Sequence, residues 1–350
     1  MSTVAAEEMR VGLCDATGLS DEVLRFGAQL GIRSVRTSGW RVRSGENRWE
    51  YEELRAFAER VESYGLRLEA IENVPYEFYD KVLLGLPGRD EQMENYRATI
   101  RNMGRAGIPI LGYHFMPNSV WSTSREPIGR GGATVRVFDM AAVTATPASA
   151  QREFSTIKTP VMDAIFAHAG EHPVSAEQMW ENYAYFLQAA LPVAEEAGVR
   201  LALHPDDPPV ESLGGVARIF KSPDDFKRGH EMANGSTAWS LDLCLGCCSE
   251  MAGGAANVRE MIEFFGPKGC IAYVHFRDVQ GSVPRFAECF IGEGNYNAAQ
   301  TMRLLKTSGF TGFVLDDHVP RMVGDEGWNF RGRAHAIGYM QGLLDSIEAQ

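Results

Sequence analysis

Four short segments in the C-terminal half of the chain constrain the fold most strongly, because each ends an apolar run with side chains that can bind a metal ion. The segments are ALHPDD (202–207), SLDLC (240–244), YVHFRD (273–278) and VLDDH (314–318). Each has the pattern of a buried strand that stops where its polar residues begin. In a parallel barrel every strand ends at the same rim, so the four polar clusters would meet. The sequence therefore predicts a metal site assembled from four separate strands.

The rest of the chain alternates strand-like and helix-like runs. Continuous apolar character predicts strands covered on both faces at 10–15, 34–39, 67–73, 110–116, 200–206, 238–244, 271–278 and 312–318. Apolar spacings of three and four residues that stop at a glycine predict helices at 20–31, 50–65, 91–107 and 175–198, with Ser20 and Ser175 as N-caps. Eight strand–helix units predict an α/β fold, a (β/α)₈ TIM barrel. A doubly wound sheet is the alternative. Such a sheet would place its ligand site at one crevice, whereas the ligand-like residues here follow several strands.

A single barrel domain over residues 1–350 is the predicted organisation, since barrels of this length are common. The spacing breaks once, after the fourth strand. Residues 117–175 have weak periodicity and include GRGGAT (129–134), which lacks the Lys-Ser/Thr pair of a phosphate-binding loop. Segments this long are usually lids or binding insertions. GEGNYN (292–297) lacks the third glycine of a dinucleotide fingerprint and follows no clear strand.

The charge balance limits the partners that the chain can have. Lys and Arg total 34 against 46 Asp and Glu, a formal net charge of −12. This argues against nucleic acid or an anionic membrane as the main partner. It does not argue against a small acid, because a metal and local arginines can reverse the field within one pocket. The six cysteines form no secreted disulfide framework and the N-terminus shows no signal peptide, so a cytoplasmic location is expected.

Histidines provide two of the candidate ligands. His204 is followed by prolines that stiffen the turn and by Asp206 and Asp207, which can orient its ring through the second nitrogen. His275 and Arg277 lie two residues apart, so strand alternation places them on one face. There, His275 could bind metal while Arg277 holds an anion or forms a structural ion pair.

The sixth and eighth strands end in thiol, carboxylate and imidazole groups. Cys244 is a candidate ligand, and Asp242 on the same strand face is its rival. Asp317 and His318 close the eighth strand, where a rim position avoids the cost of burying them. A mixed set of nitrogen, sulfur and oxygen ligands suits Zn²⁺ or Fe²⁺, whereas carboxylates with open positions suit Mn²⁺ or Mg²⁺.

Two further candidates end the third and fourth strands. Glu72 could act as a general base, a metal ligand or a satisfied acid. His114 could contact the substrate.

Together these segments resemble the mannonate dehydratases, metal-dependent enzymes of the xylose-isomerase-like barrel group. The resemblance covers most of residues 50–345 and is carried by IENVP (71–75), LGLPGRDEQMENYRATIRNMGRAGIP (84–109), YHFMP (113–117), PVAEEAGVRLALHPDDPP (192–209), LCLG (243–246), VHFRDV (274–279), DDH (316–318) and GRAHAIGYMQGLL (332–344). The resemblance implies a TIM barrel that binds Mn²⁺ or Fe²⁺ through His204, Cys244, His275 and Asp317. It also implies that His318 is the acid/base, and that a homo-oligomer forms.

The chain departs from the family pattern around this predicted shell. The family's FMPVFDWTRT is FMPNSVWSTS here, so its Asp falls on Val120 and its Arg on Thr123. The family's RPDHG is LDDHV, which replaces its Arg by Leu315 and its Pro by Asp316. The metal ligands are therefore retained while the surrounding residues differ.

The predicted function is a divalent-metal-dependent dehydratase that converts D-mannonate into 2-keto-3-deoxygluconate and water. The roles expected are acid/base for His318, anion clamp for Arg277 and second acid/base or polar support for Glu72, with His114, Asp206 and Asp242 near the substrate. One alternative is a metal-dependent sugar isomerase or epimerase, or a lyase acting on an oxidised sugar. Another is an inactive barrel that binds a sugar or serves as a partner subunit.

Overall fold

Eight parallel strands form a closed barrel in the computed structural model, which describes residues 8–39, 42 and 45–348. The barrel strands are β1 (Arg10–Asp15), β2 (Ser34–Ser38), β3 (Arg67–Glu72), β4 (Ile110–His114), β7 (Arg200–His204), β10 (Trp239–Cys244), β11 (Ile271–His275) and β14 (Phe313–Leu315). They follow one another around the ring in chain order, and β1 pairs with β14 to close it. The predicted TIM barrel is confirmed, although several strands end earlier than expected. The N-terminal stretch used to predict the location lies largely outside the described residues.

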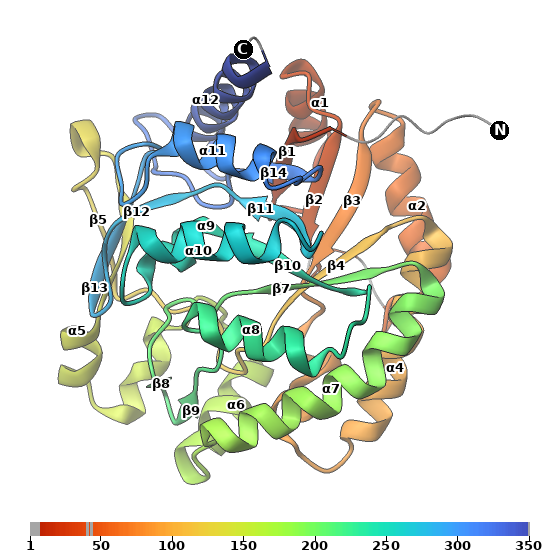
Figure 1. The fold of residues 1–350 in the computed structure, drawn as a ribbon. Helices are drawn as coiled ribbons and strands as arrows, with labels where there is room; N and C mark the ends of the chain where they lie inside the picture. Colours follow the sequence, from red (N-terminus) through yellow and green to blue (C-terminus); the bar gives the residue numbers. More distant parts are fainter. Residues whose placement is uncertain (1–7, 40–41, 43–44, 349–350) are drawn as a thin grey trace.

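Helices surround the barrel, as Figure 1 shows. Ser20 Oγ accepts a hydrogen bond from Val23 N and Ser175 Oγ from Gln178 N, so both predicted N-caps are confirmed. The helices are α1 (Asp21–Gln29), α2 (Tyr51–Glu62), α3 (Asp80–Leu84), α4 (Arg89–Ala106), α5 (Met140–Ala145), α6 (Pro160–Glu171), α7 (Ala176–Ala197), α8 (Pro223–Met232), α9 (Leu245–Glu250), α10 (Ala255–Phe265), α11 (Ala298–Thr307) and α12 (Phe330–Glu348). No helix among the described residues is long and apolar enough to cross a membrane.

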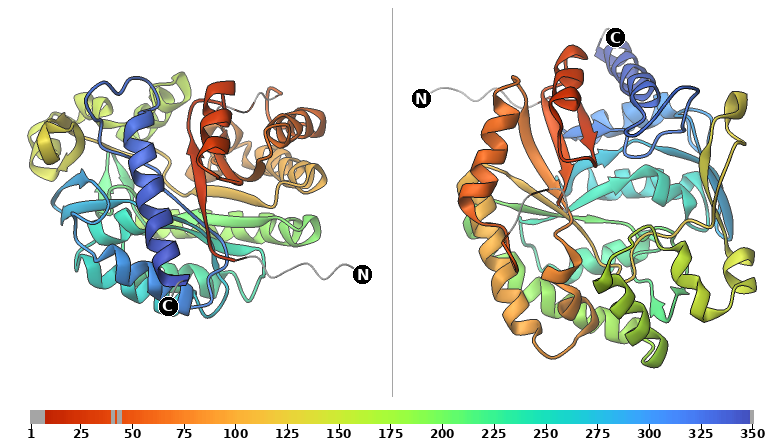
Figure 2. Two further views of the ribbon diagram at one scale, coloured as in Figure 1. Left: turned by 90° about the horizontal axis from the view of Figure 1, so that it is seen from above. Right: turned by 180° about the vertical axis from the view of Figure 1, so that it is seen from behind.

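The two ends of the chain meet at the closing seam of the barrel. In both views of Figure 2 the last helix, α12, lies beside the first strand and helix. Gln341 Nε2 donates a hydrogen bond of 2.8 Å to the carbonyl oxygen of Leu30, which links α12 to the end of α1. The C-terminal helix therefore covers the seam that β1 and β14 form.

A second, smaller sheet stands at the carboxyl side of the barrel. Its strands are β5 (Ser124–Glu126), β6 (Val135–Asp139), β12 (Asp278–Ser282) and β13 (Arg285–Cys289), paired antiparallel in the order β12-β13-β6-β5. In Figure 1 this sheet lies on the side of the barrel opposite α2. A further short hairpin pairs β8 (Ser212–Leu213) with β9 (Val216–Ala217).

The sequence patterns missed this sheet. These strands are three to five residues long and none is buried throughout, so no continuous apolar run reveals them. The expectation that residues 292–297 follow no strand was wrong, because β13 ends at Cys289. Residues 117–175, predicted from their weak periodicity to be a lid or binding insertion, contribute β5 and β6 to the sheet and also hold α5 and α6.

Large rings fill the barrel interior below the carboxyl rim. Tyr273 and Phe313 stack with ring centroids 5.2 Å apart, among small residues such as Ala70 and Ala202. Gly112 in β4 makes room for this packing. A Cβ at Gly112 would collide with the Tyr273 hydroxyl and lie 2.8 Å from Glu72 Cγ. The barrel core therefore supports the residues above it through close contact.

Replacing Gly112 by alanine should destabilise the barrel, because the methyl group has no space beside Tyr273. We expect Gly112→Ala to lower the free energy of unfolding by about 1–3 kcal/mol, the usual range for overpacking, in denaturant titrations. Gly338→Ala is the control, since a Cβ there meets nothing within 4 Å and alanine favours the helix. An equal loss of stability in both variants would contradict this account.

Candidate metal centre

Four side chains from separate strands meet at the carboxyl rim of the barrel. His204, Cys244 and His275 are the last residues of β7, β10 and β11, and Asp317 lies two residues after β14. One potential ligand atom from each of the four lies within 4.8 Å of those of the other three. All four residues are buried. The structure thus brings together the residues that the sequence singled out as metal ligands.

Strand register explains why these residues meet. Cys244 pairs with His275 across β10 and β11, so their side chains leave the sheet at the same level. Asp317 has a φ of 49°, a left-handed conformation that aspartate adopts more readily than most residues. Its Oδ2 lies 3.5 Å from His275 Nδ1. The turn after β14 therefore returns the carboxylate to the centre of the rim.

The ring nitrogens of both histidines fit a bound cation. His275 is buried, and neither of its ring nitrogens has a hydrogen-bond partner among the described residues. His204 Nδ1 lies 2.7 Å from the carbonyl oxygen of Pro205. Because a carbonyl only accepts, Nδ1 carries the hydrogen and Nε2 keeps a free lone pair. Two imidazole nitrogens, one sulfur and one carboxylate form a donor set suited to a divalent transition metal.

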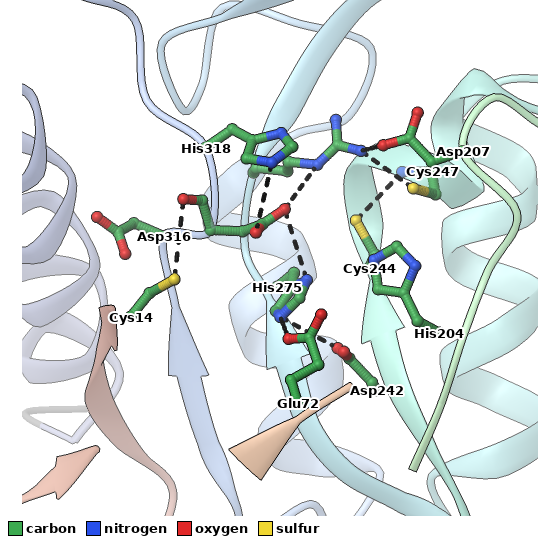
Figure 3. A network of polar contacts seen from close by, with 12 residues as sticks. Cys14, Glu72, His204, Asp207, Asp242, Cys244, Cys247, His275, Asp316 and His318 are labelled. Atoms are coloured by element: carbon green, nitrogen blue, oxygen red, sulfur yellow. Dashed lines mark hydrogen bonds and ion pairs between the residues drawn. The ribbon is translucent and has the colours of Figure 1, made fainter. Parts of the chain in front are cut away.

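Carboxylates surround His275 on its other side. Its Nε2 lies 3.3 Å from both Glu72 Oε2 and Asp242 Oδ1, as Figure 3 shows. Burial alone would lower the pKa of His275, but Asp242 and Asp317 outweigh it and raise the pKa to about 9. The cluster is therefore an environment that attracts positive charge.

The Cys244 thiol is prepared to act as a thiolate. Burial opposes ionisation, but the neighbouring Cys247 and the Arg277 guanidinium hold the pKa of Cys244 well below its usual range. The backbone N–H of Cys247 also donates to Cys244 Sγ at 3.4 Å. A thiolate is the form that binds metal ions.

Arg277 is enclosed by acids instead of facing an open space. Its Nη1 lies 2.8 Å from Glu250, its Nη2 3.1 Å from Asp207 and its Nε 3.2 Å from Asp317. The side chain does not line the cavity described below. The strand-face argument for His275 and Arg277 does not apply, because β11 ends at His275. Arg277 instead holds Asp317 in place beside the other ligands.

A cavity of about 400 Å³ opens beside the ligand cluster. Of the candidates from the sequence, Glu72, His114, His204, Asp317 and His318 line it. Cys244, His275, Asp206 and Asp242 are not among the lining residues. Asp206 Oδ2 accepts a hydrogen bond of 2.7 Å from the backbone N–H of Phe220, and Asp242 faces His275.

The cavity also has lining residues that the sequence analysis missed, among them Cys14, Arg36, Asn73, Tyr76, Arg125, Arg136, Glu288 and Arg333. Arg36 could have been found, since it is a charged residue within a strand whose five residues are all buried. Arg125, Arg136 and Glu288 come from the small sheet, which gave no signal.

Two histidines in the cavity differ in their environments. His318 Nδ1 lies 2.7 Å from Glu288 Oε1. Burial alone would raise the pKa of Glu288, but His318 and Arg136 lower it to about 2. His114 bonds to the Tyr76 hydroxyl at 3.1 Å, and burial with His204 nearby lowers the pKa of His114 to about 3. His318 thus has a charged partner, whereas His114 stays neutral near pH 7.

Comparisons with known proteins agree with this geometry. A sequence model of the D-mannonate dehydratase (UxuA) family matches residues 22–350. Mannonate dehydratase 2 of Halalkalibacterium halodurans is 29% identical over 344 residues, which cover 95% of this chain and 98% of the relative. The mannonate dehydratase of Lactococcus lactis is 29% identical over 329 residues, 86% of this chain and 87% of the relative. The crystal structure of mannonate dehydratase from Streptococcus suis serotype 2 superposes with a TM-score of 0.84 and 26% identity, covering 97% of this chain and 95% of that one.

Metal binding at this cluster should release protons. In the metal-free protein His275 keeps its second proton up to about pH 9, and a metal ion must displace it. The affinity for Mn²⁺ should therefore rise about tenfold per pH unit below that value and level off above it. Titration calorimetry in two buffers of different ionisation enthalpy measures both the affinity and the protons released. An affinity for Mn²⁺ that does not change with pH would rule out His275 as a ligand.

Proposed function

Because the chain belongs to the D-mannonate dehydratase family, we propose that it removes water from D-mannonate to give 2-keto-3-deoxygluconate. The observation that carries the proposal is the meeting of His204, Cys244, His275 and Asp317 beside a cavity large enough for a sugar acid. This reaction breaks the C2–H and C3–O bonds, and the enol that results becomes the 2-keto group. The site must therefore make the C2 proton acidic, accept it, and give a proton to the departing hydroxyl.

We propose that these four residues bind Mn²⁺ or Fe²⁺, with Mg²⁺ or Zn²⁺ as alternatives, since mixed ligand sets accept several ions. A divalent ion there would draw charge from the substrate carboxylate and so acidify the neighbouring C2 proton. Asp242 is better placed to orient His275 than to replace Cys244, because it lies 3.3 Å from His275 Nε2. Such carboxylate–histidine pairs commonly support metal ligands.

His318 is the proposed acid/base. Its Nδ1 faces the Glu288 carboxylate at 2.7 Å, and because an ionised carboxylate only accepts, this nitrogen carries a hydrogen. Nε2 is then the nitrogen that exchanges a proton with the substrate. His318 is partly exposed and lines the cavity, so a substrate can reach it.

Glu72 and Arg277 are assigned supporting positions around this centre. Glu72 lines the cavity, forms an ion pair with Arg36 and lies beside His275, so we propose it as the second acid/base or as a polar support. For Arg277, expected from the sequence to clamp the substrate anion, we propose a positioning role through Asp317, because acids already surround its guanidinium.

The insertion at 117–175 supplies one wall of the cavity. Ser119, Val120, Arg125, Arg136, Thr156 and Ile157 are among the lining residues. We propose that this segment covers the bound substrate, which would exclude water from the reacting atoms. The expected homo-oligomer stays a prediction.

Incubating the Mn²⁺-loaded protein with a panel of aldonates should yield a 2-keto-3-deoxy acid from D-mannonate, measured by chromatography. His204→Ala should lose this activity together with bound metal, because one ring-nitrogen ligand is removed. His172→Ala is the matched control, as this histidine is exposed on α6's C-terminal side. A ketose or epimer as product would support the isomerase alternative, and binding without turnover would support an inactive barrel.

Replacing His318 by asparagine tests the acid/base separately from metal binding. We expect His318→Asn to lower kcat by about 10²–10⁴-fold, with metal content and KM close to those of the wild type. Glu288→Gln keeps the His318 imidazole but removes the carboxylate that binds it, so kcat should fall less than in His318→Asn. Full activity in His318→Asn would contradict the assignment.

A further inference from the structure

Two arginines of the small sheet face each other at the outer end of the cavity. Arg125 in β5 lies directly opposite Arg136 in β6, and both side chains line the cavity. Residues directly opposite on neighbouring strands share one face of a sheet, and like charges placed so are destabilising. Arg125 is exposed and Arg136 half-buried, whereas the metal-binding cluster is buried. The fold thus places two repelling cations in the less buried part of the cavity wall.

The nearby acids that the structure describes form no ion pair with either of these arginines. Among the described residues no carboxylate lies within ion-pair distance of Arg125 or Arg136. Glu288 in the cavity wall attracts both arginines, but its Oε1 is already bound to His318 Nδ1 at 2.7 Å, and Arg136 Nη1 lies 3.5 Å from that same nitrogen. Glu126 accepts a hydrogen bond from Ser124 Oγ at 2.7 Å instead.

The other two arginines of the cavity wall have partners. Arg36 forms an ion pair with Glu72, and Arg333 lies 3.0 Å from Asp316. The positive excess is therefore confined to the Arg125–Arg136 end. Loss of hydration beside its neighbours and the charge of Arg136 also lower the pKa of Arg125.

We propose that Arg125 and Arg136 form an anion subsite for a second acidic group of the substrate. The preferred substrate would then be a sugar acid with an additional carboxylate or phosphate at the end remote from the metal centre. The inference rests on the proposed function, which assigns the first carboxylate to the metal centre. Guanidinium groups bind paired oxygens of carboxylate or phosphate, and D-mannonate offers only a hydroxyl at that end.

Calorimetric titration of the full chain with three probes tests the subsite. The probes are D-mannonate, D-mannarate, which has a carboxylate at each end, and D-mannonate 6-phosphate, each added to metal-free and Mn²⁺-loaded protein. We expect the wild type to bind at least one doubly acidic probe about tenfold or more tightly than D-mannonate, because charge-assisted hydrogen bonds are worth that much. Tighter binding of D-mannarate identifies a carboxylate as the second acidic group, and tighter binding of D-mannonate 6-phosphate identifies a phosphate.

Arg125→Gln and Arg136→Gln should each reduce this affinity ratio about tenfold. Neither variant breaks an ion pair among the described residues, and Arg136→Gln loses only a 3.5 Å contact with His318 Nδ1, so the Tm should change little. Arg130→Gln is the matched control, because Arg130 lies on the same insertion, pairs with Glu293 and is outside the cavity wall. The ratio should not change in this control.

Similar affinities for all three probes in the wild type would overturn the subsite. The subsite would also be overturned if the two variants lost affinity equally for D-mannonate and for the doubly acidic probes. The arginines would then bind the one carboxylate that all three probes share. The titrations of the metal-free protein measure binding without turnover. If the protein dehydrates D-mannonate but does not prefer a doubly acidic probe, only the anion subsite is contradicted. If it prefers a doubly acidic probe but dehydrates none of the three, only the proposed function is contradicted.

Discussion

Closure of the barrel brings the ends of β7, β10 and β11 and the turn after β14 around one axis. Each delivers one side chain, and the strand ladders hold the backbones at the required spacing. Four ligand atoms can therefore approach within 4.8 Å although nearby charges repel and His275 has no hydrogen-bond partner among the described residues. The barrel core below, where Tyr273 stacks on Phe313, keeps these strand ends from relaxing apart.

The cost of this arrangement is a concentration of buried charge. An unpaired ion in a protein interior has lost its hydration, which costs free energy. Removing one member of a buried ion pair leaves the other member with that cost. Arg277 offsets Asp207, Glu250 and Asp317 on one side of the cluster. On the other side, Glu72 and Asp242 leave His275 in a field that favours a cation. The described side chains therefore leave an excess of negative charge around His275, as expected of a site that binds a metal ion.

The small sheet gives the cavity its chemical character. The barrel strands supply the metal-binding cluster, whereas β13 supplies Glu288 for His318, and β5 and β6 supply Arg125 and Arg136. Residues from the insertion after β4 and from the segment after β11 are therefore joined in one wall. The cluster of candidate ligands and much of the cavity wall therefore come from separate structural layers.

The sequence by itself determined the barrel, its eight strands and the set of four candidate ligands. These features are local, since an apolar run that ends in His, Cys or Asp marks both a strand and its rim. It could not reveal the partners of His318 or the surroundings of Arg277. Glu288 reaches His318 only because β13 pairs with β12 and β6, and Arg277 meets Asp207 and Glu250 only after the strand has ended. Short strands carry little periodic signal, and contacts between residues far apart in the chain exist only once register and closure are set. Tertiary structure therefore decided the surroundings of His318 and the charge of the cavity wall.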